Sequence, residues 1–301
     1  TILSESGETV RLFAGANETV SFQLIIDAPA NGLPAVRILP GTLASEKKHT
    51  LPTDAIRLFR MLPVEVTEFP AWYLRLVDRQ PAPDRYYDPL VPANSPRGGQ
   101  PYRLARGERL AMWVDLAVPR TARPGLYHGT SRIDISAFEG YRFDVDLKVR
   151  DYVLPDAKSL AVAGGFEHAT LFRTFVRRNG QPYEPAYLDA ENPLIKEGMT
   201  YFRQIMILAH EHRIDLFDKN LRPKITRNAM GKLDLDWSSY DHILKPFLRG
   251  TAFSDHIGCS AWPIPFTDTW PVPHYYGGLD APTYAETAKQ IVAKSGRHFR
   301  A

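Results

Sequence analysis

Apolar and polar positions alternate through most of the first half of the chain. Between residues 141 and 150, five apolar side chains alternate with five charged ones, and similar alternation recurs over 110–118 and 20–26. A two-residue period is the pattern of a β-strand that is buried on one face. Since no amphipathic helix separates these strands, the pattern predicts an antiparallel β-sandwich over residues 1–155.

One stretch rich in proline and glycine, residues 80–107, interrupts this alternation. Proline donates no backbone hydrogen bond to a sheet, so we expect a long loop here rather than a core strand. A loop of this length is either functional or a simple connector, and the sequence leaves both interpretations open.

The hydrophobic pattern changes its period after Pro155. Short apolar runs without alternation, typical of strands buried on both faces, are followed by apolar residues at helical spacing. The expected strands are 160–166, 214–217 and 258–262, and the expected helices contain 202–212, 240–248 and 284–292. Asp236 is a candidate N-cap, and Thr283 with Glu286 forms a candidate capping box. The alternating order predicts a parallel sheet.

Residues 156–301 are too few for a closed (β/α)8 barrel, which takes about 250 residues. We therefore predict that they form the first βα units of a TIM-type barrel that is incomplete in this chain. A small open α/β domain is the alternative. The predicted fold class is thus multidomain β plus α/β, with a sandwich at 1–155 and a partial barrel at 156–301.

Composition narrows the possible functions. The 25 prolines among 301 residues exceed an average share of ~5% and argue against a helical bundle. The net charge is only +3 and the basic residues are not clustered, so we expect no nucleic-acid partner. No apolar run approaches the ~18 residues of a membrane span. The single cysteine, Cys259, excludes an internal disulfide and a cysteine-based zinc site.

Barrel enzymes carry their active sites at the carboxyl ends of the strands. This rule selects Glu167 and His168 after the first strand, Asp218 and Asn220 after the second, and Trp262 after the third. Two neighbouring carboxyl groups can act as general acid and general base, so Glu167 and Asp218 are the candidate catalytic residues. Alternatively, these side chains cap helices or bind loop backbone.

The segment 268–278 is rich in aromatic residues and contains two prolines. Flat aromatic rings suit the apolar faces of sugars, so Trp270, Tyr275 and Tyr276 join His168 and Asn220 as candidate substrate-binding residues, together with Trp262. The alternative is a loop that packs its aromatic side chains over the barrel rim.

The sequence offers no convincing metal or cofactor site. His210 and His212 are two apart on a predicted helix and point in different directions, so they cannot chelate one ion. We expect His212 to be a core residue. Cys259 lies in a predicted buried strand without an activating base, so a nucleophilic role is not expected. No glycine-rich phosphate loop is present, and we expect no cofactor.

Six motifs follow one another along the chain: Asn17–Leu24, Tyr87–Pro92, Trp113–Pro119, Pro124–Gly129, Asp236–Asp241 and Phe247–Gly250. Together they resemble a bacterial glycoside-hydrolase-like family, catalogued as domain of unknown function 4091 and related to the family 123 β-N-acetylgalactosaminidases. The resemblance covers nearly the whole chain.

The resemblance implies a β-sandwich followed by a (β/α) barrel that holds the sugar site, and an oligo- or polysaccharide substrate. It also implies an adjacent Asp-Glu catalytic pair, but this sequence contains no Asp-Glu dipeptide. We expect a glycoside-hydrolase-like protein whose catalytic pair lies outside this chain. The alternatives are a non-catalytic sugar-binding or cell-surface accessory protein and a structural scaffold. The chain shows no signal peptide, and we favour a periplasmic or secreted location over a cytoplasmic one.

Overall fold

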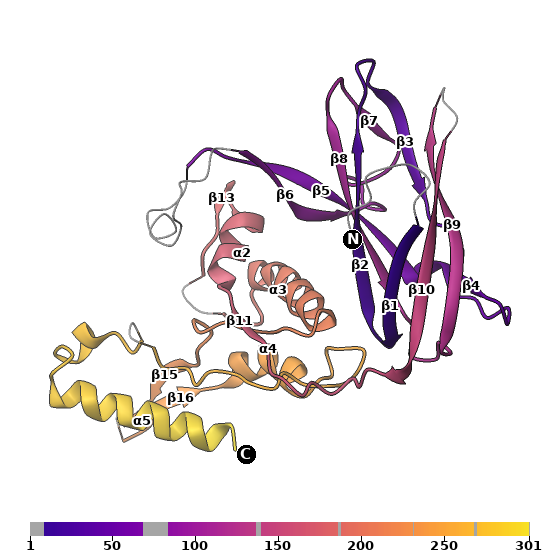
Figure 1. Ribbon diagram of the computed structural model, residues 1–301. Helices are drawn as coiled ribbons and strands as arrows, with labels where there is room; N and C mark the ends of the chain where they lie inside the picture. Colours follow the sequence, from indigo (N-terminus) through magenta and orange to yellow (C-terminus); the bar gives the residue numbers. More distant parts are fainter. Residues whose placement is uncertain are drawn as a thin grey trace, which may run out of the picture. The chain divides into compact units, whose positions relative to one another are not determined.

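The computed structural model describes residues 9–68, 84–136, 140–185, 188–230, 232–267 and 270–300. The chain separates into two compact units, one ending at Pro155 and one beginning at Asp156 (Figure 1). In its described residues the first unit contains strands and one short 3-10 helix, whereas the second mixes helices with short strands.

Two sheets make up the first unit, which confirms the sandwich-like prediction in outline. One sheet has the order β1–β10–β9–β3–β7 with β4 beside β9, and the other has the order β2–β8–β5–β6. The strands are β1 (Thr9–Ala16), β2 (Thr19–Asp27), β3 (Leu33–Leu39), β4 (Ala44–Ser45), β5 (Ile56–Val66), β6 (Asp84–Pro92), β7 (Tyr102–Leu104), β8 (Arg109–Ala117), β9 (Gly125–Ile135) and β10 (Tyr141–Val153); η1 (Thr53–Ala55) precedes β5.

The sandwich is not wholly antiparallel, because β1 pairs in parallel with β10. After β1 the chain turns at Asn17, which has a positive φ of 63°, and enters β2 in the other sheet. The first strand therefore has no hairpin partner in its own sheet and pairs instead with the last strand of the unit.

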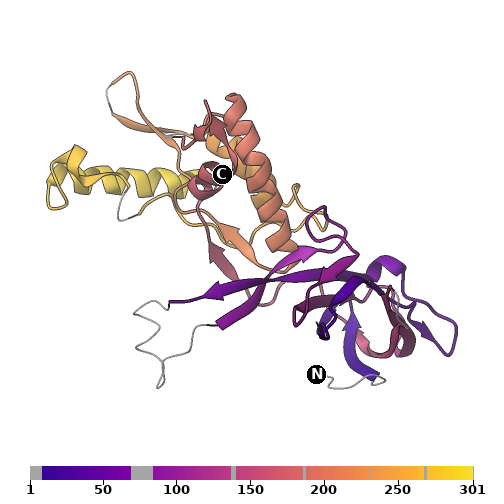
Figure 2. The ribbon, with the colours of Figure 1, turned by 90° about the horizontal axis from the view of Figure 1, so that it is seen from above.

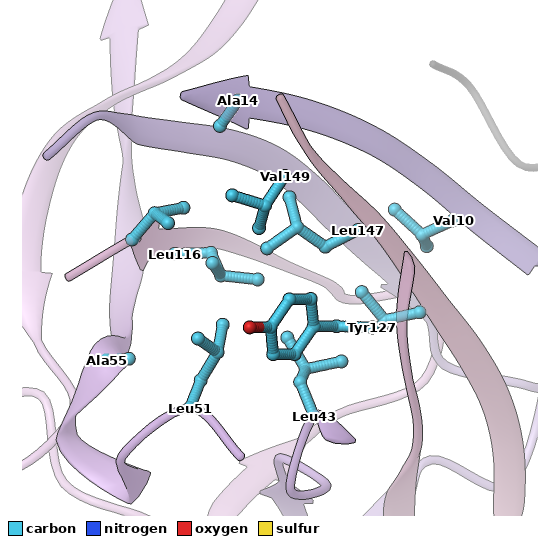
Figure 3. Close-up of a cluster of buried hydrophobic side chains, with 11 residues drawn as sticks. Val10, Ala14, Leu43, Leu51, Ala55, Leu116, Tyr127, Leu147 and Val149 are labelled. Atoms are coloured by element: carbon cyan, nitrogen blue, oxygen red, sulfur yellow. The ribbon is translucent and has the colours of Figure 1, made fainter. Parts of the chain in front are cut away.

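The predicted inward positions form the core of the sandwich. Val145, Leu147 and Val149 of β10 are buried, and Leu116 of β8 packs against them in the same cluster. Tyr127 lies in the middle of this cluster (Figure 3), and its hydroxyl donates to the Arg123 carbonyl at 3.0 Å. Burying each such side chain contributes about 1.5–3 kcal/mol, so the alternating pattern directly specifies the stable face.

The loop prediction for residues 80–107 is wrong in part. Residues 80–83 lie outside the described residues, but 84–92 form β6 and 102–104 form β7. Both are edge strands, where proline is tolerated because the unused side of the strand needs no donor. The outer part of β5, Pro63–Val66, pairs only with β6, and together they run on beyond the other strands of their sheet (Figure 2).

The second unit begins with the strand–helix order that the sequence predicts, and β11 pairs in parallel with β14. The described residues contain no closed barrel, since these two strands are the only parallel pair in this unit. Its elements are β11 (Ala163–Gly165), α2 (His168–Phe175), β12 (Arg177–Arg178), β13 (Gln181–Pro182), α3 (Pro193–Glu211), β14 (Asp215–Phe217), β15 (Lys224–Arg227), β16 (Leu233–Asp236), α4 (Ser238–Leu248), η2 (Pro273–Tyr276) and α5 (Pro282–His298).

Three local predictions in this unit are wrong. Residues 258–262 form no strand. His212 is exposed and ends α3 as its C-cap, whereas His210 is the buried histidine. The Thr283 hydroxyl bonds the Tyr276 carbonyl instead of forming a capping box. Asp236 does accept hydrogen bonds from the Ser238 backbone and hydroxyl, one residue before the N-cap position of α4.

Searched over the described residues, the helices include none that is both long and apolar enough to cross a lipid bilayer.

Candidate functional site

The carboxyl ends of β11 and β14 meet at one edge of their small sheet because the two strands are parallel. The Phe166 N–H continues the pairing to the Phe217 carbonyl at 3.0 Å. Glu167 and His168 therefore emerge beside Asp218, and the structure brings these predicted residues together with Asn220.

Asp218 is fully buried and holds this group in place. Its Oδ2 accepts the His168 backbone N–H at 2.5 Å, and its Oδ1 accepts the Asn220 N–H at 2.7 Å. His168 is the first residue of α2, and the preceding Glu167 side chain makes no capping bond. A carboxylate from the neighbouring strand therefore caps this helix, where unpaired N–H groups and the helix dipole favour negative charge.

The His168 ring is oriented by the same carboxylate. Its Nδ1 lies 2.6 Å from Asp218 Oδ2, and the ring packs edge-on against Phe172. A carboxylate partner assigns the proton to Nδ1, which leaves Nε2 as the acceptor nitrogen of the neutral ring. His168 and Asp218 thus form an aligned pair whose Nε2 can accept a hydrogen bond from a hydroxyl group.

A pocket of about 200 Å³ adjoins this group. Glu167, His168 and Asn220 line it, and Asn220 Nδ2 donates to Glu167 Oε1 at 3.3 Å. Arg173 and Glu184, which pair at 2.9 Å, lie on its wall. The remaining lining residues are Ala169, Pro185, Leu188, Leu221 and Arg222.

Sequence reasoning missed the ion pair and Arg222. Arg173 lies on α2, five residues after His168, and the sequence predicted no helix over these residues. Glu184 reaches the pocket through the β12–β13 hairpin, whose two-residue strands left no recognisable pattern.

The predicted aromatic residues do not line this pocket. Trp262 is half-buried and packs against the α3–α4 cluster. Trp270 is only 7% exposed, packs with Leu233 and Ile291, and has the Arg222 guanidinium 5.6 Å from its ring centre. Tyr275 and Tyr276 line a different groove.

Metal binding would require grouped ligand side chains, and thiol chemistry would require an ionised Cys259 thiol. Among the described residues, no three histidine, cysteine or acidic side chains are grouped to hold an ion. Burial, reinforced by the nearby Asp215 carboxylate, raises the pKa of the Cys259 thiol to about 11. The thiolate form is therefore scarce at neutral pH, which makes Cys259 a poor nucleophile.

Comparison with solved structures gives a likeness that extends over most of the chain. The fold is similar to a family 123 glycoside hydrolase from Clostridium perfringens, with 12% sequence identity over 79% of this chain and a TM-score of 0.60. The chain spans 40% of the length of that hydrolase. At this identity the match shows a shared fold.

The other similarities are weaker. A PapD-like domain of a human protein matches 48% of this chain and 83% of its own at 10% identity, with a TM-score of 0.29. The fimbrial subunit MyfA from Yersinia enterocolitica matches 48% of this chain and 95% of its own at 10% identity, with a TM-score of 0.24. Scores this low carry no argument. No family model matches the sequence, and no curated protein matches it.

Proposed function

We propose that this protein is a carbohydrate-active protein of the glycoside-hydrolase type. In this proposal the second unit forms the first βα units of a (β/α)8 barrel, and the pocket beside Glu167, His168 and Asn220 contacts a sugar. The observation that carries the proposal is the fold similarity to a glycoside hydrolase over 79% of the chain. The site lies at the carboxyl ends of parallel strands, where barrels hold their ligands.

The pocket chemistry suits a polyhydroxylated ligand. The Glu167 carboxylate accepts hydroxyl hydrogen bonds, and its contact with Asn220 fixes its direction. His168 Nε2 supplies a second acceptor. Asp218 is buried and already accepts bonds from His168 and Asn220, so we assign it a positioning role. Glu167 remains the candidate for acid–base chemistry.

We expect this chain by itself to bind glycans without cleaving them, because it contains no adjacent Asp-Glu pair. Binding is measured by titration calorimetry against a panel of neutral oligosaccharides, and turnover is measured with aryl glycosides. Glu167→Gln weakens binding by about tenfold through the loss of a charged acceptor. The control Glu46→Gln alters an exposed carboxylate on the first unit and leaves binding unchanged.

Two results contradict this proposal. If the folded chain binds no member of the panel, the pocket is not a sugar site. Glycosidase turnover by this chain would show that its own residues suffice for catalysis, which refutes the interpretation based on the missing Asp-Glu pair.

A non-catalytic sugar-binding or cell-surface accessory role is the second candidate function, and the missing Asp-Glu pair favours it. Under this alternative, the full-length gene product binds oligosaccharide and hydrolyses none. Hydrolysis of any member of the panel by the full-length product excludes the alternative.

A further inference from the structure

A larger groove lies between the β15–β16 hairpin and the beginning of α5. Its volume is about 890 Å³, and it shares no lining residue with the pocket beside Glu167. The lining residues are Arg227, Lys232, Leu233, Tyr275, Tyr276, Pro282, Thr283, Glu286, Thr287 and Gln290.

Tyr275 gives this groove an aromatic edge. Tyr275 is 78% exposed and lies on η2, which Val272 separates from the buried Trp270 and Pro271. The turn after η2 is closed by the Gly278 N–H bonding the Pro273 carbonyl at 3.0 Å. Gly277 and Gly278 have φ values of 90° and 103°, which favour glycine. The Tyr275 ring is therefore exposed to solvent, beside a turn whose backbone conformation is fixed by a hydrogen bond within the turn.

Opposite charges lie on the two sides of the groove. Arg227 ends β15 and Lys232 precedes β16, so both basic side chains come from the hairpin. Glu286 and Gln290 lie one turn apart on α5 and bond each other at 2.9 Å. The hairpin side can therefore bind an anion, while the helix side offers a hydroxyl acceptor and amide groups.

We propose that this groove binds a pyranose that carries a carboxylate, as a second sugar site beside the one proposed above. The sugar ring stacks on Tyr275, its carboxylate pairs with Lys232 and Arg227, and its hydroxyls bond Glu286 and Gln290. This proposal rests on the proposed carbohydrate function. It assigns acidic saccharides to the groove because two cations and one stacking ring together suit a ligand that is both anionic and flat-faced.

The test uses the whole chain and two probes of equal length, an oligogalacturonate and the corresponding neutral oligogalactose, in titration calorimetry. We expect the acidic probe to bind more tightly. Tyr275→Ala weakens its binding by about tenfold, the loss that corresponds to ~1.4 kcal/mol of stacking. Lys232→Glu abolishes the preference for the acidic probe, and added salt weakens binding of that probe alone.

Matched variants control for general effects. Tyr141→Ala removes another exposed tyrosine, on the sandwich, and Lys47→Glu reverses another exposed lysine charge there. Neither changes binding of either probe. Because Tyr275 and Lys232 are exposed, the unfolding temperature of each variant stays close to that of the parent chain.

The outcomes separate this proposal from the function proposed above. Binding of the acidic probe that depends on Tyr275 and Lys232 but not on Glu167 supports the groove site, even if the Glu167 pocket binds nothing. Equal affinity for both probes, or acidic binding that survives Tyr275→Ala and Lys232→Glu, overturns the groove proposal. Neutral binding that is lost in Glu167→Gln still supports the first site.

Discussion

The Asp218 carboxylate joins two elements of the candidate site by accepting bonds from the first residue of α2 and from Asn220. It is fully buried, so its removal takes a hydrogen-bond acceptor away from donors in the interior. The His168 N–H and ring would then be buried without their acceptor, which costs more than the bonds themselves contribute.

We predict that Asp218→Ala lowers the free energy of unfolding by about 2–4 kcal/mol and also removes sugar binding at the pocket, since His168 and Asn220 lose their positions. Urea unfolding and calorimetric titration measure the two effects. Asp280→Ala removes an exposed carboxylate from the same unit and is expected to change stability by less than about 0.5 kcal/mol. A loss of binding with unchanged stability would contradict the capping role of Asp218.

Single residues show both the reach and the limit of prediction from the sequence. The strand-end rule selected Glu167, His168, Asp218 and Asn220, because it depends only on the order of strands and helices. It left open whether Asp218 is catalytic or caps a helix, because that choice depends on the spacing of the two strands. His212 was assigned to the core because the helical period was continued one step too far, to the C-cap of α3.

At the scale of elements, α2 and α3 approach closely because α3 has a glycine at their contact. A Cβ on Gly198 would lie 2.3 Å from the Phe172 ring, and Phe172 is itself fully buried. A methyl group there forces a shift between two packed helices, and overpacking of this kind costs about 1–3 kcal/mol. Replacing glycine by alanine gains about 1 kcal/mol of helix propensity. This gain is smaller than the upper part of the overpacking cost, so it does not offset the clash.

We therefore predict that Gly198→Ala destabilises the protein, whereas Gly296→Ala stabilises it. Gly296 lies in α5, where the nearest atom to a new Cβ is an Arg300 side-chain nitrogen at 3.6 Å. The substitution thus gains about 0.5–1 kcal/mol without a clash. Thermal unfolding of the two variants beside the parent chain measures the difference in sign. Stabilisation by both substitutions would show that α2 and α3 separate at little cost.

Helices and strands with a strong hydrophobic period could be predicted from the sequence. Elements whose conformation depends on tertiary contacts could not. The alternation in β10 and the stripes of α3 and α4 each bury a continuous face, so their patterns were sufficient. The β15–β16 hairpin was missed, although Leu233–Asp236 alternates, because each of its strands has only four residues. The segment 258–262 is mostly apolar but forms no strand. Among the described residues β14 pairs with β11 alone, so this segment does not join their sheet.

At the scale of the whole molecule, the buried acids among the described residues, Asp215 and Asp218, lie in the second unit. Asp215 is almost fully buried and pairs with Lys158 at 2.6 Å, and it accepts the Ser260 hydroxyl at 2.5 Å. Burial acts to raise the pKa of Asp215, but Lys158 and Ser260 outweigh it and lower the pKa below the usual value. The pKa of Asp255, an exposed residue, is lowered as well, because the Ile257 N–H and His210 outweigh the partial desolvation of its carboxylate.

A carboxyl group whose pKa is lower in the folded state adds stability above its unfolded pKa, and this contribution is lost as the pH falls through the folded value. The unfolded value for aspartate is about 3.9, so the second unit is expected to lose stability below about pH 4. In the sandwich, the pKa of Asp27 is also lowered, because this carboxylate pairs with Arg109 at an exposed position. Solvent screens that pair, so it contributes little.

We predict that acid unfolds the second unit before the first. Amide NMR spectra recorded from about pH 6 to about pH 3 are expected to lose the signals of Phe202 and Met206 while those of Leu147 and Val149 remain. In Lys158→Met/Asp215→Asn the buried ion pair is replaced, and the pH dependence of the second unit becomes shallower because one linked carboxylate is gone. Simultaneous loss of both sets of signals, or an unchanged slope in the double variant, would mean that acid acts through other groups.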